Sequence, residues 1–175
     1  MTRPDSTERG DLLGPLSGRV IDVATRKPVS SAYVLALWKV DGHSATPPIY
    51  QATRTNADGR YYLGKLVNPP TYPARVADLT LYVYHSGYVA YRSDRYFGDN
   101  SERHDFAQEW GTVGLDRMTG AVSRVQHLEF LAPAQSILGN VLEKERFEAN
   151  QERTGQVERG HKEGRQHGRV DGGQE

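Results

Sequence analysis

The sequence contains no cysteine, carries no net charge and has no long apolar run. Without cysteine, the chain can form no disulfide, no zinc–thiolate site and no thiol nucleophile. Lys plus Arg and Asp plus Glu both number 22, which argues against a dedicated nucleic-acid partner, because nucleic-acid-binding proteins carry a basic face. No stretch approaches the ~20 apolar residues that a membrane span requires.

The first residues also lack the features of a secretory signal. Residues 1–14 include Arg3 and Arg9 but no apolar segment, whereas a signal peptide needs one after its basic start. We therefore expect a cytoplasmic location by default. An extracellular or periplasmic location is expected instead if the chain is a processed fragment.

What the sequence does contain is a series of short strand and turn signals, densest between residues 16 and 66. The run of residues 32–38 is apolar on both faces, which favours a strand near the middle of a sheet. Gly18, within the predicted strand over 16–23, lets a neighbouring backbone or ring lie close. Gly59 follows Asp58 in a tight turn and is expected to have a positive φ, which makes residues 49–55 and 60–66 a hairpin.

Later segments extend the same pattern. Residues 77–84 alternate, with Leu79, Leu81 and Val83 on one face. Further strands are predicted over 88–97 and 123–131. About seven short strands separated by turns predict an all-β fold, an antiparallel Greek-key-type β-sandwich with a short C-terminal helix and a disordered tail.

The composition changes along the chain and predicts four segments. They are a flexible N-terminal arm over 1–13, the β-sandwich over 14–132, a short amphipathic helix over 133–153, and a disordered polar tail over 154–175.

The motifs between residues 16 and 97 resemble those of the carboxypeptidase regulatory-like domain. The matching positions are Gly18-x-Val20-x-Asp22, Pro28-Val29, Ala32-x-Val34, Thr53-x-Thr55, Asp58-Gly59-x-Tyr61-x-Leu63 and Ser86-Gly87-Tyr88. The chain departs from the family at Arg26-Lys27, where a glycine usually precedes the proline. The resemblance implies a transthyretin-like sandwich, and most such domains are non-catalytic accessory or adhesive modules.

A weaker resemblance connects the chain to the intradiol ring-cleavage dioxygenases. Trp38, Tyr72-Pro73, Arg75-x-Ala77 and the segment 96–99 are similar to parts of that family. The family implies a non-haem iron held by two tyrosines and two histidines. Asp78 and Thr80 stand where the two histidines belong, although Tyr50 and Tyr72 could correspond to the tyrosines. The alternative function is therefore a diverged dioxygenase-like iron protein.

A cluster of tyrosines and arginines is the best binding candidate in the sequence. Tyrosine offers a large contact area with a polar tip, and arginine is enriched at binding surfaces. The competing interpretation is that these tyrosines fill the sandwich or its rim. The candidate binding residues are Tyr82, Tyr84, Tyr88, Arg92 and Arg95.

No group of residues predicts catalysis, a metal or another cofactor. The histidines show no ligand spacing, and the serines lack a nucleophile elbow. Residues 94–105 carry oxygen ligands suited to calcium, but their spacing does not match an EF-hand and a solvated loop is favoured. We expect a non-catalytic binding or structural module with a protein or carbohydrate partner.

Overall fold

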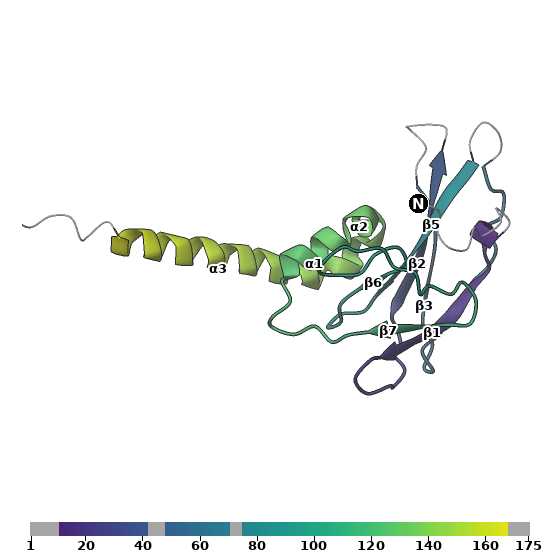
Figure 1. The fold of residues 1–175 in the computed structure, drawn as a ribbon, viewed down its shortest axis with the longest axis horizontal. Coiled ribbons are helices and arrows are strands. Elements are labelled where there is room, and N and C mark those ends of the chain that lie inside the picture. Colours follow the sequence, from purple (N-terminus) through teal and green to yellow (C-terminus); the bar gives the residue numbers. More distant parts are fainter. Residues whose placement is uncertain (1–10, 42–47, 71–74, 168–175) are drawn as a thin grey trace, which may run out of the picture. The chain divides into compact units, whose positions relative to one another are not determined.

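The computed structural model describes residues 11–41, 48–70 and 75–167. The chain divides into two compact units, Met1–Met118 and Thr119–Glu175, and each is described by itself. The first consists of strands and the second of helices (Figure 1). Of the predicted N-terminal arm, residues 1–10 lie outside the described part, and Asp11–Leu13 form the short 3-10 helix η1.

The described residues of the first unit form seven strands. They are β1 (Leu16–Asp22), β2 (Tyr33–Asp41), β3 (Ile49–Arg54), β4 (Arg60–Leu63), β5 (Arg75–Tyr84), β6 (Tyr91–Arg92) and β7 (Gly111–Leu115).

These strands form two sheets, with the orders β4-β1-β7 and β3-β2-β5-β6. One apolar cluster unites residues from both sheets, including Leu16 and Val20 of β1 and Val34 and Leu81 of the second sheet. The predicted β-sandwich is therefore confirmed. All pairs are antiparallel except β1 with β7, which is parallel.

The local strand patterns account for this core. β2 lies between β3 and β5. Its run of apolar residues therefore lies near the middle of the sheet, as the sequence predicts. In β5 the alternation places Leu79, Leu81 and Val83 in the shared core. The indole nitrogen of the buried Trp38 donates to the carbonyl oxygen of Leu12, at 2.6 Å, which ties η1 to the end of this core.

The turn between β3 and β4 differs from the predicted hairpin. Gly59 has the expected positive φ, 72°, and its amide donates to the carbonyl of Asn56. However, β3 pairs with β2 and β4 pairs with β1, so the turn carries the chain from one sheet to the other. The hairpin prediction was wrong because a tight turn sets the chain direction locally, whereas the ladder partners come from distant segments.

Gly18 is the point of closest approach within the three-stranded sheet. It pairs with Tyr61 on β4 and with Gly111 on β7. A Cβ at this position would lie 2.6 Å from the Gly111 carbonyl oxygen and 2.7 Å from the Tyr61 hydroxyl. The Tyr61 side chain is buried in the core, and its burial raises the pKa of Tyr61 to about 12. The expected close approach of a ring and a backbone is confirmed.

Gly18→Ala should therefore destabilise the sandwich. Overpacking of this kind costs about 1–3 kcal/mol, because the Gly111 carbonyl is backbone and cannot rotate away. Denaturant unfolding followed by tryptophan fluorescence measures the loss. Gly64→Ala is the matched control, since no atom lies within 4 Å of its added Cβ. Equal stability of the two variants would contradict the steric argument.

The second unit contains the helices. They are α1 (Arg124–Phe130), η2 (Ala132–Ala134), α2 (Gln135–Leu138), η3 (Gly139–Leu142) and α3 (Glu143–His167).

The strand predicted over 123–131 is thus a helix, α1. Ser123 is its N-cap, and the Ser123 hydroxyl accepts from the backbone amide of Gln126, at 3.3 Å. This cap satisfies one of the free amides of the first turn, which favours the helix over a strand. The place of the seventh strand is taken by β7, Gly111–Leu115, a segment for which the sequence predicts no strand.

The helix α3 is longer than the sequence predicts. It continues to His167, so residues 154–167 of the predicted disordered tail are helical, and residues 168–175 lie outside the described part. The division between the units falls after Met118. Residues 119–132, predicted as part of the sandwich, belong to the helical unit.

Candidate functional site

The predicted tyrosine surface on β5 is buried. Tyr82 and Tyr84 alternate with the core residues of β5, as predicted, but their side chains are only 2% and 3% exposed. The Arg92 guanidinium lies 5.4 Å from the centre of the Tyr82 ring. Burial raises the pKa of Tyr82 to about 12. These two tyrosines therefore offer almost no contact area to a partner.

The other three predicted residues are engaged within the fold. Tyr88 donates its hydroxyl hydrogen to Asp22, at 3.0 Å. Arg92 forms an ion pair with Asp94, at 2.8 Å. Arg95 donates to the carbonyl oxygen of Asn100. The five predicted residues do not form one exposed surface, because a tyrosine-rich strand next to arginines can satisfy its aromatic faces and charges internally.

The loop considered for calcium is held together by internal contacts. Asp94 and Asp105 pair with Arg92 and Arg103, and Asp99 accepts from the backbone and side chain of Ser101. The Ser101 amide is the main cause of a pKa for Asp99 below its ordinary value. Within the described ranges, no three histidine or carboxylate side chains gather as a metal site would require.

Of the positions that resemble the dioxygenase ligands, Tyr50 and Thr80 lie in register on either side of Leu37 in β2. Tyr50 is 52% exposed on β3. Asp78 accepts from the backbone amide of Leu79, at 2.8 Å, and Thr80 lies two residues further along β5. Tyr72 lies outside the described residues.

A different feature lies beside β1 and β4 of the three-stranded sheet and the end of β3. An open groove of about 410 Å³ lies there, and we refer to it as the β1 groove. It is lined by Ser17, Gly18, Arg19, Thr53, Arg54, Asn56, Arg60, Tyr61, Tyr62 and Trp110. Three arginines and no acidic residue line it, all within the described part of the chain. Its volume is within the range of small-ligand sites.

One end of the β1 groove is aromatic. Tyr62 on β4 pairs directly with Ser17 on β1, and the backbone amide of Trp110 donates to the Ser17 hydroxyl, at 3.1 Å. Tyr62 and Trp110 therefore flank Ser17 from the two sides. Their side chains are 65% and 78% exposed, so both rings are accessible at this end of the groove.

The other end of the β1 groove is basic. Arg19 points to the same side as Ser17, two residues further along β1, and it pairs in register with Arg60 on β4. The Arg19 Nε donates to the carbonyl of Asp58, and Arg54 donates to the carbonyl of Ser31. None of these three arginines has an acidic partner among the described residues.

The backbone at Trp110 holds its side chain at the rim of this groove. Trp110 has a φ of 59°, in the left-handed region that costs about 1–3 kcal/mol for residues other than glycine. The chain then enters β7 at Gly111, which pairs with Gly18. This conformation directs the chain into β7 and leaves the Trp110 side chain exposed beside the groove.

A second polar cluster in this unit is centred on Asp22 and acts as a structural tie. The Asp22 side chain is buried and accepts from the Thr25 amide, the Tyr88 hydroxyl and the Arg117 Nε, at 2.8, 3.0 and 2.7 Å. The Thr25 amide is the main reason why the pKa of Asp22 lies far below its usual range. The carboxylate thus joins the turn after β1 to the segment before β6 and to the segment after β7.

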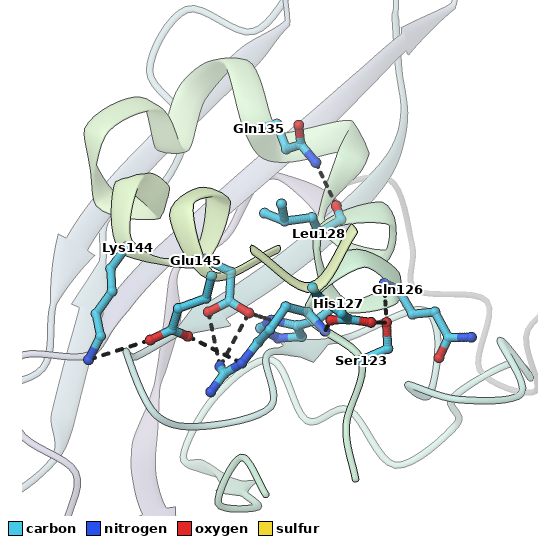
Figure 2. Close-up of polar contacts among 10 residues, drawn as sticks. Ser123, Gln126, His127, Leu128, Gln135, Lys144 and Glu145 are labelled. Carbon is cyan, nitrogen blue, oxygen red and sulfur yellow. Dashed lines mark hydrogen bonds and ion pairs between the residues drawn. The ribbon is translucent and has the colours of Figure 1, made fainter. Parts of the chain in front are cut away.

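The helical unit contains a buried ion-pair cluster (Figure 2). His127 Nδ1 of α1 lies 2.8 Å from Glu145 Oε1 of α3, and both side chains are buried. Arg124 contacts Glu145 at 3.4 Å and Glu148 at 3.2 Å. Burial alone would raise the pKa of Glu145, but the hydrogen bond and charge of His127, with Arg124, hold that pKa below its ordinary value.

The serine next to this cluster, Ser123, caps α1. The Ser123 hydroxyl donates to Glu152 Oε1, and the Arg124 amide donates to Glu152 Oε2, both at 2.7 Å. The Glu152 carboxylate of α3 thus accepts hydrogen bonds from the first residues of α1 and from the Ser123 hydroxyl. An open hollow of about 470 Å³ beside these residues is lined by residues 119–124 and by Gln151, Glu152 and Gly155. Glu152 is already engaged as this cap.

Sequence reasoning missed the β1 groove because its parts are far apart in the chain. The link between Ser17 and Trp110 spans 93 positions, and the parallel pairing of β1 with β7 creates it. One local signal was present, since Trp110 is preceded by Glu109 and followed by Gly111 in a polar segment where a core tryptophan is not expected.

The fold and the groove together define a two-sheet β-sandwich with a basic and aromatic groove on one face. No family model matches the chain, and no curated protein matches it significantly. No helix among the described residues is long and apolar enough to cross a membrane.

Three solved structures show a distant likeness. A 9R-lipoxygenase from Cyanothece PCC8801 has 17% identity over 65% of this chain and 18% of its own, with a TM-score of 0.33. A 3-chlorocatechol 1,2-dioxygenase from Rhodococcus opacus 1CP has 16% identity over 59% of each chain, with a TM-score of 0.40. A streptococcal ancillary pilin has 13% identity over 60% of this chain and 29% of its own, with a TM-score of 0.31. The chain spans less than two thirds of each of these proteins, and functional conclusions rest on its own residues.

Proposed function

We propose that the sandwich is a non-catalytic binding module of the carboxypeptidase regulatory-like type, which contacts a carbohydrate or protein through the β1 groove. The observation that carries the proposal is the groove itself, where two exposed aromatic rings and three arginines line one open hollow. Aromatic residues and arginine are the side chains that dominate binding energy at recognition surfaces.

The motif positions agree with such a role. Gly18 lies close to the Gly111 backbone and the Tyr61 ring, Gly59 has a positive φ, and Asp22 fixes the turn after β1. These positions support a rigid scaffold under the groove. The groove contains no histidine and no carboxylate to act as an acid or base, which favours binding over chemistry.

The double variant Tyr62→Ser/Trp110→Ala tests the proposal. The intact chain is applied to an array of oligosaccharides and peptides, and its strongest ligand is then titrated against the variant. Loss of each buried aromatic contact costs about 2 kcal/mol at a binding hot spot, so the affinity should fall at least tenfold while stability stays within about 0.5 kcal/mol. Tyr50→Ser is the control, because Tyr50 is also exposed but does not line the groove.

Two results would overturn this proposal. The first is unchanged affinity of the double variant for that ligand. The second is stoichiometric iron in the purified protein together with a visible tyrosinate absorption and turnover of catechols, which would make the protein a dioxygenase-like enzyme instead.

A further inference from the structure

We infer that the β1 groove binds a carboxylate-bearing oligosaccharide, that is, a chain of uronic-acid sugars. The inference rests on the proposed binding function and specifies its ligand. Three features carry it: the spacing of aromatic and basic side chains along β1, the arginines that have no acidic partner among the described residues, and the pairing of β1 with β4 and β7.

The aromatic and basic ends of the groove are separated by the repeat of one strand. Ser17 and Arg19 are two residues apart on the same side of β1, which corresponds to roughly 6.5 Å along the strand. The aromatic rings flank Ser17, and Arg60 stands opposite Arg19. A sugar ring stacked at Ser17 can therefore direct its carboxylate, or that of the next ring, to the two guanidinium groups.

The charges of the groove call for an anionic ligand. Each guanidinium has five N–H donors, arranged to meet a carboxylate through two of them. Arg19 uses its Nε on the Asp58 carbonyl, which orients the group, and Arg60 has no ion-pair partner among the described residues. A neutral sugar would leave this positive charge without a counterpart.

The pairing of β1 argues for a sugar over an extended peptide. Peptides that bind to sheets usually add a strand to a free edge, where backbone groups are available. The groove floor is β1, whose ladder is occupied by β4 on one side and β7 on the other. Recognition on the β1 floor itself must use side chains, although the edge strands β3 and β4 also line the groove. Exposed aromatic rings with arginines suit the flat faces and carboxylates of an acidic sugar.

The test compares a short oligogalacturonate with its methyl-esterified form, which keeps the rings and removes the charges. Trp110 provides the signal, because Trp38 is only 1% exposed and Trp110 is 78% exposed. The acid form should change the Trp110 emission and bind at least tenfold more tightly than the ester, with an affinity that falls as salt is added.

Arg60→Gln and Arg19→Gln should each weaken binding of the oligogalacturonate about tenfold or more. Lys39→Gln, an exposed change on β2 outside the groove lining, should leave the affinity unchanged. Thermal unfolding of each variant separates a lost contact from a lost fold.

Three outcomes would overturn the inference. They are equal binding of the acid and the ester, no binding of the acid form, and tighter binding of an oligoglutamate peptide or an oligothymidylate through the same arginines. The last result would leave the binding function in place and change only the ligand. If the aromatic double variant instead kept full affinity for its array ligand, the proposed function itself would fail.

Discussion

Replacing Asp22 with Asn should lower the melting temperature of the sandwich by roughly 10 °C, since loss of a few charged hydrogen bonds has effects of this size in a small domain. The Asp22 carboxylate is buried and accepts from Thr25, Tyr88 and Arg117. An Asn side chain has only one acceptor oxygen, so its NH2 group would face at least one of these three donors and leave that donor without an acceptor. Tryptophan fluorescence measures the loss in this unit alone, because the only two tryptophans are Trp38 and Trp110.

The same substitution should make the folding stability less dependent on pH under acidic conditions. The Thr25 amide, with Arg117 and Tyr88, keeps the pKa of Asp22 far below that of an unfolded aspartate, which is about 3.9. A carboxyl whose pKa is lowered by folding contributes stability above the unfolded pKa and loses it as the pH falls towards the folded pKa. The wild type should therefore lose stability steeply below about pH 4, and Asp22→Asn much less so.

Asp116→Asn is the control, because Asp116 is exposed and adjacent to Arg117 in the chain. It should leave both the melting temperature and the pH profile as in the wild type. If Asp22→Asn still loses stability steeply below about pH 4, other carboxylates control acid unfolding. The contacts of Asp22 with Thr25, Tyr88 and Arg117 would then contribute little to stability.

The parts of this fold that were predictable are those whose signals are local. The alternation of β5 identified its core face, and Gly18 and Gly59 were recognised from their turn and strand contexts. Each of these depends on a few consecutive residues whose side chains alternate in direction or whose backbone needs a special φ. The two-sheet architecture followed from the number and spacing of such segments.

The helix α1 shows how a local signal can be misread. Leu128 and Phe130 are two residues apart and suggest a strand face, but both are buried on a helix. The sequence Ser123-Arg124-Val125-Gln126 matches the capping-box pattern at the start of a helix, and this was the signal that could have decided the case. A strand in this position would also have needed a sheet edge to pair with.

The candidate site was less predictable than the fold because exposure is a tertiary property. Tyr82 and Tyr84 have the composition of a contact surface, yet they are buried. Trp110 and Tyr62 were not among the predicted binding residues but are exposed, and distant strands bring them to either side of Ser17. Which aromatic residues remain available to a partner depends on these long-range pairings and not on the local composition.

In the helical unit, Glu145→Ala should cost about 3–5 kcal/mol of stability, because removing one member of a buried ion pair leaves the other without compensation. Glu145 is 2% exposed and lies against His127 and Arg124 (Figure 2). Circular dichroism at the helical minimum reports mainly on this unit, whereas tryptophan fluorescence should remain that of the wild type. Glu143→Ala, an exposed change in the same helical turn, should have little effect.

The double variant His127→Leu/Glu145→Leu distinguishes the loss of a charge partner from the loss of packing. If the cost of Glu145→Ala comes from an uncompensated buried group, replacing both partners with apolar side chains should recover much of the stability, since such exchanges are often neutral. The two changes would then be strongly non-additive. If the double variant instead loses as much stability as His127→Leu and Glu145→Leu lose together, Glu145 acts through packing at its position in α3. The ion pair with His127 would then contribute little to the packing of α1 against α3.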